Sequence, residues 1–386
     1  MNNFEFFNPT RIIFGRGTIQ KLNEHMSQDA IVLICYGGGS IKKNGVYDQV
    51  ISALNGREVY EFGGIEPNPD YDTLLKAIDL GRHKQIDFVL AVGGGSVIDG
   101  AKLVAAGIPY KGGDPWDIVT GEKEVALGEA LPLGTVLTLP ATASEMNGTS
   151  VISRRATAEK FAWESEAAYP AFSILDPTTT YTLPEKQVRN GIVDAYIHVV
   201  EQYATYPVDG KLQDRYAEGI LLTLQEVAQK ALETPPDYDA RANLMWSATN
   251  ALNRLIGKGV PTDFATHMIG HELTALYGLA HAESLAVVLP HLLWYKRDKK
   301  GEKLVQYANR VWGIFGTGED VIREGLDKMV AFFNSIKMPT RLTDFGIDPV
   351  EAAEKLQERF TERGTRLGEH KDITPADVAS ILKMSR

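Results

Sequence analysis

The sequence predicts two domains: an N-terminal α/β domain built on a doubly wound parallel sheet, and a C-terminal domain built only from helices. With 386 residues, the chain is longer than one ordinary hydrophobic core accommodates. Before about residue 180, short β-branched runs alternate with helix-like segments. From Pro184 onward, apolar residues recur almost throughout at helical spacing. We therefore expect an α/β domain over residues 1–180 and a helical domain over residues 181–386.

Local patterns predict the order of elements in the first domain. Apolar runs that end in glycine turns are typical of buried strands, and a turn signal such as "EPNPD" precedes a helix. The expected order is a strand in 30–36, a helix over 46–54, a strand over 58–62, a helix over 71–84, a strand in 87–92, a helix over 97–106 and a strand in 134–140. Such alternation predicts parallel strands in a doubly wound sheet.

Composition and charge narrow the functional classes. The net charge of −10 argues against a polyanionic partner such as nucleic acid. The one cysteine, Cys35, lies in an apolar run, so we expect a buried thiol in a protein of the reducing cytoplasm. The N-terminal segment lacks the order of a signal peptide, and the longest stretch without charged residues, 130–144, is interrupted by two prolines. These features predict a water-soluble protein.

Two glycine-rich turns are candidates for binding a nucleotide diphosphate. Gly93, Gly94, Gly95 and Ser96 stand between a predicted strand and a helix start, where free N–H groups and the helix dipole favour anions. A tight turn without a ligand has the same composition, so one such segment is weak evidence. A second turn, Gly37–Ser40, has the same setting, and two turns provide two contacts for one dinucleotide.

The second turn also bears on the choice between NADP and NAD. An acidic side chain usually holds the ribose 2′-hydroxyl of NAD and would repel the 2′-phosphate of NADP. No acidic residue lies between Tyr36 and Tyr47, and Ser40 is soon followed by Lys42 and Lys43. The loop therefore favours NADP(H). NAD(H) stays possible if the lysines are only solvated charges at a helix start.

Histidines in the second domain suggest a metal site. Asp194 and His198 are four residues apart on a predicted helix and share a face, and His267 and His271 have the same spacing. His281 follows ten residues after His271. A carboxylate with several imidazoles suits Zn²⁺ or Fe²⁺, whereas each histidine alone is equally consistent with a hydrogen-bonded core residue. Spacing alone ranks His267 and His271 as the ligand pair.

In order along the chain, a set of segments resembles the iron-containing alcohol dehydrogenase family. The resemblance is closest to its NADPH-dependent aldehyde reductase and butanol dehydrogenase branch. The segments span nearly the whole chain and include "YGGGSIKKNGVYDQV", "LAVGGGSVIDGAK", "LTLPATASEMN", "GIVDAYIHVVEQY" and "HMIGHELTALYGLAHAESLAVVLP". The resemblance implies a Rossmann-like nucleotide-binding domain and a helical metal-binding domain, an architecture shared with dehydroquinate synthases.

The same resemblance implies which residues act. It assigns a divalent metal, Fe²⁺ or Zn²⁺, to Asp194, His198, His267 and His281, and it makes His271 a proton-relay residue beside the metal. Together with the second glycine turn, the implied cofactor contacts are Gly37, Gly38, Gly39, Ser40, Gly93, Gly94, Gly95, Ser96, Asp99, Thr138, Thr142, Asn147 and Lys160. One departure concerns this last group, because Ala143 replaces the glycine that many members carry before Ser144.

The expected activity is the reversible reduction of small aldehydes of the butanal type to primary alcohols with NADPH. Other interpretations are an NADH-dependent alcohol or glycerol dehydrogenase of the same superfamily, a metal-dependent hydrolase, and a non-catalytic nucleotide or redox sensor. A hydrolase has no use for two glycine turns, and a sensor has none for the histidine cluster. The N-terminal segment "NFEFFNPTRIIFG" is expected to pair at a sheet edge, in a homodimer.

Overall fold

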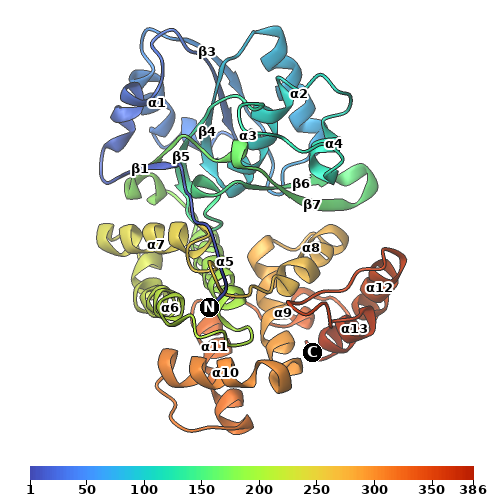
Figure 1. Cartoon of the computed structure of the whole chain (residues 1–386). Helices are drawn as coiled ribbons and strands as arrows, with labels where there is room; N and C mark the ends of the chain where they lie inside the picture. Colours follow the sequence, from blue (N-terminus) through green and yellow to red (C-terminus); the bar gives the residue numbers. More distant parts are fainter. The chain divides into compact units, whose positions relative to one another are not determined.

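The computed structural model describes all residues of the chain, from Met1 to Arg386. Two compact units make up the chain (Figure 1). The α/β unit comprises Phe7–Pro184 and Thr234–Asn253, and the helical unit comprises Met1–Phe6, Glu185–Glu233 and Arg254–Arg386. The units are therefore not two consecutive halves of the chain. The main boundary lies at 184/185, and two short segments belong to the unit on the other side of it.

The α/β unit is built on a six-stranded sheet in which every neighbouring pair of strands is parallel. Residues of one strand alternate between two hydrophobic clusters: Leu33 and Cys35 belong to one cluster, and Val32 and Ile34 to the other. A sheet covered on both faces is doubly wound, so the predicted fold class is confirmed. The strand order is β1 (Arg11–Phe14), β8 (Phe172–Leu175), β5 (Leu133–Leu139), β4 (Phe88–Gly94), β2 (Ile31–Tyr36) and β3 (Glu58–Phe62).

Helices supply the apolar side chains that cover the two faces of this sheet. The first cluster contains side chains of α2 (Tyr71–His83) and α3 (Gly95–Gly107), and the second contains those of α1 (Val46–Ala53). The short helix α4 (Trp116–Thr120) adds Trp116 to the first cluster. Because α3 directly follows the glycine turn of β4, its burial fixes where that turn lies.

Some elements of this unit are absent from the sequence-based prediction. Strand β8 has four residues, all of them buried, which is too short a run for periodicity to detect. An antiparallel hairpin, formed by β6 (Thr149–Arg154) and β7 (Glu159–Glu164), stands outside the main sheet. The hairpin begins in the loop region that follows β5, which is the part of the chain with predicted cofactor contacts.

Helix α7 (Tyr238–Ala251) belongs to the α/β unit although it lies among the helical segments of the sequence. The guanidinium of Arg241 donates to the carbonyl oxygen of Thr180 at 2.6 Å. The hydroxyl of Thr249 donates to the Glu145 carboxylate at 2.6 Å, and Met245 joins the first hydrophobic cluster. Buried polar groups need such partners, so these contacts decide the unit in which α7 packs.

The helical unit surrounds helix α5 (Glu185–Tyr203), which is buried on all sides from Gly191 to Tyr203 (Figure 1). A helix with no exposed face must be enclosed by others, which explains its weak amphipathic pattern. The other helices of the unit are α6 (Lys211–Leu232), α8 (Ala265–Tyr277), α9 (His281–Tyr295), α10 (Arg297–Val311), α11 (Glu319–Ser335), α12 (Pro349–Glu362) and α13 (Pro375–Lys383). The prediction of a domain built only from helices is confirmed for this unit.

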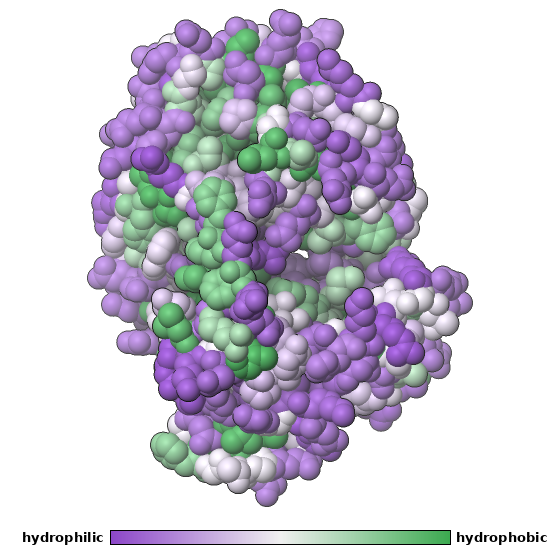
Figure 2. Space-filling model, in the orientation of Figure 1, coloured by the Kyte–Doolittle hydropathy of each residue, from purple (hydrophilic) through white to green (hydrophobic).

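The thiol and the surface of the chain show the properties expected from composition. Cys35 is buried in β2, and burial raises the pKa of its thiol to about 12, so it is not a nucleophile at neutral pH. No helix combines the length and apolar character that crossing a membrane requires. The face shown in Figure 2 is mainly hydrophilic, with hydrophobic residues in patches between the polar ones.

Candidate metal centre and nucleotide-binding loops

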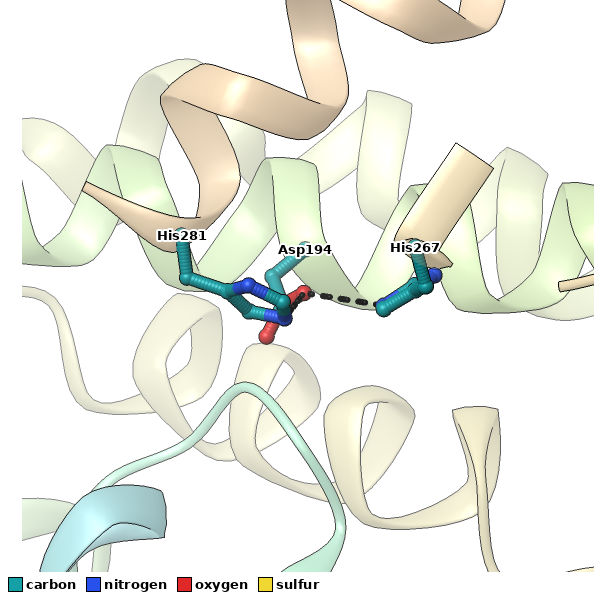
Figure 3. A group of neighbouring side chains, drawn as sticks. All are labelled: Asp194, His267 and His281. Carbon is teal, nitrogen blue, oxygen red and sulfur yellow. Dashed lines mark ion pairs between the residues drawn. The ribbon is translucent and has the colours of Figure 1, made fainter. Parts of the chain in front are cut away.

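Three side chains from three helices of the helical unit converge on one point (Figure 3). Asp194 comes from the middle of α5, His267 from the first turn of α8, and His281 from the first residue of α9. Their ligand atoms all lie within 4.8 Å of one another, a spacing that one metal ion can bridge. In Figure 3 both imidazole rings are directed toward the carboxylate of Asp194.

One carboxylate oxygen of Asp194 lies at the centre of the predicted ligand set. Its Oδ1 atom is 3.6 Å from Nε2 of His281 and 3.9 Å from Nε2 of His267. The same oxygen is 3.6 Å from Nδ1 of His198, one turn further along α5. The ring of His198 stacks on that of His267, with 4.4 Å between centroids. His198 is outside the compact group of three, but all four predicted ligands meet at one oxygen.

His271 takes a different position from these four residues. It lies one turn beyond His267 on α8, and its ring centroid is 6.2 Å from that of His267 and 5.5 Å from that of His281. Its side chain is buried, and it does not belong to the group that converges on Asp194. The pair that helical spacing ranks first is therefore not the pair that the fold brings together. His281 takes the place of His271.

The group has the chemistry of a site for Fe²⁺ or Zn²⁺. Imidazole and carboxylate ligands suit these ions, and an imidazole must be neutral to bind one. Burial, with the neighbouring His267, keeps the pKa of His198 well below its ordinary value, so this ring is neutral at pH 7. Its Nδ1 atom is buried and has no hydrogen-bond partner. A buried ring nitrogen without such a partner, beside a carboxylate, fits a divalent metal ion.

The first glycine turn joins β4 to α3 in the α/β unit. A Cβ atom at Gly93 would lie 2.6 Å from Cγ2 of Val97, and one at Gly95 would lie 2.5 Å from Oγ1 of Thr142. Packing alone therefore requires glycine at these positions. Helix α3 starts at Gly95 without a side-chain cap, which leaves its first N–H groups for an anion. The hydroxyl of Ser96 accepts a hydrogen bond from the main chain of Asn68.

A buried lysine holds the loop that follows β5. The Nζ atom of Lys102, on α3, donates to Ser144 Oγ at 2.9 Å, to Asn147 Oδ1 at 3.1 Å and to the Thr149 carbonyl at 2.7 Å. Ser144 in turn donates to Asp99 Oδ1 at 2.5 Å. Lys102 is 1% exposed, and a charge so deeply buried needs partners of this kind. Lys102 is not among the predicted residues, although it lies one helical turn from Asp99.

Asn147 serves the interior of the same loop. Its Oδ1 atom accepts hydrogen bonds from Lys102 and from the main chain of Thr149. Its Nδ2 atom donates to the carbonyl oxygens of Thr142 and Leu252, at 3.3 Å in each case. Because both ends of the amide are hydrogen-bonded to protein groups, Asn147 stabilises the loop and is a weaker candidate for a cofactor contact.

The remaining predicted contacts in this region have exposed surface to differing extents. Asp99, Thr142 and Lys160 are partly exposed, whereas Thr138 is buried. Burial raises the pKa of the Asp99 carboxyl even though the cation of Lys102 is near. Lys160, on β7, donates to the side chain of Asn68 at 2.9 Å. Thr142 and Lys160 therefore keep surface that a ligand can reach, whereas both carboxylate oxygens of Asp99 accept hydrogen bonds, from Ser144 and from the main chain of Val151.

Ala143 adopts a left-handed backbone conformation, which glycine adopts more readily than alanine. Its φ of 52° and ψ of 21° are left-handed, and its side chain is fully buried. Left-handed backbone costs an alanine on the order of 1 kcal/mol relative to glycine. The contacts of the neighbouring Ser144 with Asp99 and Lys102 hold the loop in this conformation.

The second glycine turn follows β2 and ends beside an acidic side chain. Gly39 is left-handed, with φ of 85°, and the exposed Ser40 begins a short 3₁₀ turn. The Lys42 ammonium is 2.7 Å from Oε2 of Glu61, and the Tyr47 hydroxyl contacts the same carboxylate. Burial acts to raise the pKa of Glu61, but hydrogen bonds from Lys42 and Tyr47 outweigh it and hold that pKa below its ordinary value.

Glu61 changes the charge expected of this loop, which the sequence alone shows as free of acidic residues. It stands near the end of β3, so inspecting residues 36–47 alone does not reveal it. An acidic residue about twenty positions after a glycine turn is a usable sequence signal for a ribose contact in dinucleotide-binding folds. Here the Lys42 cation neutralises it, and Lys43 stays exposed. The loop therefore offers one free cation and one internally paired carboxylate.

Comparison with known proteins gives matches along the whole chain. Residues 9–177 match the family model described as iron-containing alcohol dehydrogenase. Residues 189–386 match the model for the C-terminal part of the Fe-containing alcohol dehydrogenase family. Together the two matches cover far more than half of the sequence.

Individual relatives are similar over nearly their full length. The chain is 55% identical over 381 residues to the NADPH-dependent aldehyde reductase YqhD of Escherichia coli (strain K12), covering 97% of each chain. It is 42% identical over 391 residues to the probable NADH-dependent butanol dehydrogenase 1 of Bacillus subtilis (strain 168), covering 100% of both. The crystal structure of E. coli K-12 YqhD superposes with a TM-score of 0.96 at 53% identity, covering 100% of this chain and 99% of that one.

Replacing Lys102 with methionine should destabilise the α/β unit. The change leaves three acceptors without their buried donor and removes the cation beside Asp99. Breaking a buried charged network costs about 3–5 kcal/mol, so we expect the free energy of unfolding in urea to fall by about 3 kcal/mol. The matched control is Lys76→Met on the exposed face of α2. Equal stability of the two variants would show that the network contributes nothing.

Proposed function

The chain belongs to the iron-containing alcohol dehydrogenase family and is an NAD(P)-dependent oxidoreductase. From that premise we propose that it reversibly reduces small aldehydes to primary alcohols, with NADPH as hydride donor and a divalent metal ion. The observation that carries the proposal is the meeting of one carboxylate and three imidazoles in a chain with two glycine turns. The NADPH-dependent aldehyde reductase that is 55% identical supports the choice of substrate and cofactor.

Asp194, His198, His267 and His281 are the proposed metal ligands, for Fe²⁺ or Zn²⁺. When bound, the ion supplies Lewis acidity, which polarises the carbonyl group of an aldehyde. The protein contributes a buried site: Asp194 and His198 are each 3% exposed, so little water competes there. The single carboxylate also lowers the net charge of the site below that of a site with imidazoles alone. Zn²⁺ binds such ligands more tightly than Fe²⁺, so supply in the cell decides which ion is present.

The α/β unit is the proposed nucleotide domain. The turn at 93–96 and the start of α3 would hold the diphosphate through main-chain N–H groups, while Gly37, Gly38, Gly39 and Ser40 would face the adenosine ribose. Hydride transfer is chemistry that the cofactor brings, and the protein has to place the nicotinamide. The proposed further contacts are Asp99, Thr138, Thr142, Asn147 and Lys160, with Asn147 acting mainly through the loop.

His271 is the proposed proton-relay residue. Reduction of an aldehyde requires one proton for the alcohol oxygen, and an imidazole exchanges protons readily near neutral pH. The ring of His271 is 5.5 Å from that of His281 and lies outside the group that converges on Asp194. This position beside the proposed ligands supports a role in proton transfer rather than in coordination.

NADH is the alternative cofactor that a specific observation favours. The probable butanol dehydrogenase of B. subtilis is NADH-dependent and 42% identical, and Glu61 here lies beside the second glycine turn. Against this alternative, Glu61 is paired with Lys42, and the side chain of Ser40 is small and exposed. We therefore propose NADPH as the preferred cofactor.

The exposed edge of the sheet and the single cysteine bear on the assembly and the location of the protein. β1 forms one edge of the six-stranded sheet and bears the exposed side chain of Phe14, with the exposed Phe7 just before it. An open apolar edge of this kind favours pairing, and we propose a homodimer. Sedimentation of the protein as a monomer would contradict it. A single buried cysteine is consistent with a reducing cytoplasm.

Metal removal tests the proposed reaction directly. Protein stripped of metal by a chelator should not oxidise NADPH in the presence of butanal, and reloading with Fe²⁺ or Zn²⁺ should restore the rate. The rate with NADPH should exceed that with NADH at equal concentration. Activity that survives complete removal of metal would refute the role of the ion, and a preference for NADH would refute only the choice of cofactor.

His267→Ala and His271→Ala should separate metal binding from proton transfer. His267→Ala removes a proposed ligand, so we expect loss of both bound metal and turnover. His271→Ala should retain the wild-type metal content while turnover falls roughly a hundredfold, the usual contribution of a general acid or base. Metal content is measured by elemental analysis and turnover by NADPH absorbance. Equal loss of metal in both variants would place His271 among the ligands.

Ser40→Asp should weaken NADPH binding far more than NADH binding. The new carboxylate would lie beside the 2′-phosphate and repel it, by at least ~1.4 kcal/mol or about tenfold in Kd. Fluorescence titration with each nucleotide measures the two Kd values. Ser52→Asp, on the exposed face of α1 in the same unit, is the control for added charge. An equal loss for NADPH and NADH would mean that Ser40 does not face the phosphate.

A further inference from the structure

Helix α5 carries a third acidic or imidazole side chain on the face that bears Asp194 and His198. Glu201 is three residues beyond His198 and seven beyond Asp194, which places all three on one side of the helix. It is 5% exposed, so its carboxylate is not a surface charge. A carboxylate buried this deeply must have a structural partner, because burial is costly for an unpaired charge.

That partner is the proposed metal ligand His267. One oxygen of Glu201, Oε1, accepts the main-chain N–H of His267 at 3.2 Å. The other oxygen, Oε2, contacts the ring nitrogen Nδ1 of the same residue. Glu201 therefore holds both the backbone and the ring of His267, and it ties α8 to α5 at the point where each helix contributes a ligand.

The contact at Nδ1 decides which ring nitrogen is available to a metal. A carboxylate oxygen beside Nδ1 favours the tautomer with its proton on that nitrogen, which leaves a lone pair on Nε2. Nε2 is the atom of His267 that points to Asp194, at 3.9 Å from Oδ1. The ring is thus oriented, and its tautomer selected, for coordination through Nε2.

A buried ion pair between Asp263 and Lys300 holds the turn before α8 next to Glu201. The main-chain N–H of Asp263 donates to the Glu201 carbonyl at 2.9 Å, and the Asp263 side chain accepts from the N–H of Ala265 at 2.8 Å. Lys300, which is 2% exposed, lies 2.9 Å from the Asp263 carboxylate and 2.7 Å from that of Glu369. Asp263, in the turn before α8, is therefore held by Glu201, Ala265 and Lys300. His267 cannot move away from Glu201 without breaking these buried contacts.

We infer that Glu201 is a positioning residue of the metal site. Through its two contacts with His267, it orients the ring of that histidine for metal binding. The inference rests on the proposed function, because it presumes that His267 is a metal ligand. Outer carboxylates of this kind commonly raise metal affinity by about 10–100-fold. Glu201 itself is not a proposed ligand, because Oε1 accepts the main-chain N–H of His267 and Oε2 contacts Nδ1 of the same residue. The proposed ligand atom, Nε2, lies on the other side of the ring.

Glu201→Gln is the variant that tests the inference. Glutamine has the same shape but only one acceptor oxygen, so its NH₂ group must face either the main-chain N–H or the ring nitrogen of His267. If the NH₂ group faces Nδ1, it favours the tautomer with the proton on Nε2, and a protonated Nε2 atom cannot bind a metal. We expect the Kd for Zn²⁺, measured by competition with a chromogenic chelator, to rise about 10–100-fold. The visible spectrum of the Co²⁺-loaded protein should change as well.

Glu218→Gln is the matched control within the same unit. Glu218 is another 5% exposed carboxylate, on α6, and it accepts hydrogen bonds from Tyr203 at 2.9 Å and from Arg310 at 3.0 Å. Its loss disrupts a buried network that includes none of the proposed ligands. We expect this variant to lose thermal stability but to keep the wild-type Kd for Zn²⁺ within about twofold, well inside the tenfold effect expected of an outer carboxylate.

The outcomes separate this inference from the proposed function. A Glu201→Gln protein that loses stability but binds Zn²⁺ as tightly as wild type would show that Glu201 is only a helix-packing residue, and would overturn the inference alone. Wild-type protein that binds neither Zn²⁺ nor Co²⁺ would overturn the proposed metal site and the inference together. Weaker metal binding in Glu201→Gln, with Glu218→Gln unchanged, supports both.

Discussion

The buried carboxylate of Asp194 is the constraint on which the helical unit depends. A carboxylate that is 3% exposed is costly to bury unless opposite charge or a metal ion compensates it. Three helices bring imidazole nitrogens to within 3.9 Å of one of its oxygens, where a bound metal ion would supply the compensating charge. The approach of α8 to α9 is close enough that a Cβ atom at Gly270 would lie 2.7 Å from Leu285. Helices α5, α8 and α9 thus pack closely around one buried carboxylate.

Each unit uses a buried lysine to fix a loop next to its functional groups. Lys102 holds the loop after β5 in the α/β unit, and Lys300 holds the turn before α8 in the helical unit. In both places the ammonium group is almost fully enclosed and has several oxygen partners. Such networks add little net stability compared with apolar packing, but they allow only one arrangement of the loop. Positioning, rather than stability, explains why polar groups occupy these core positions.

Much of the fold could be predicted from the sequence because local patterns mark most of its strands and helix starts. The strands at β2, β3, β4 and β5 have apolar runs and turn signals, and the glycine turns mark where helices begin. Strand β8 has only four residues, so no periodicity could reveal it. The membership of α7 depends on Arg241 and Thr249 meeting Thr180 and Glu145, which are distant in sequence. No local pattern records partners that lie 61 and 104 residues away in the sequence.

For the candidate site, the sequence alone determined the chemical types and the pair within one helix. Asp194 and His198 share a face because an α-helix has 3.6 residues per turn, and that geometry needs no tertiary contact. Helical spacing favoured His271 over His281, and the tertiary structure brings His281 to Asp194 instead. Gly278, left-handed at φ of 69°, ends α8 and turns the chain so that α9 starts with His281 toward Asp194. Helical spacing describes neighbours on one helix, whereas a metal centre is assembled from several helices whose approach only packing sets.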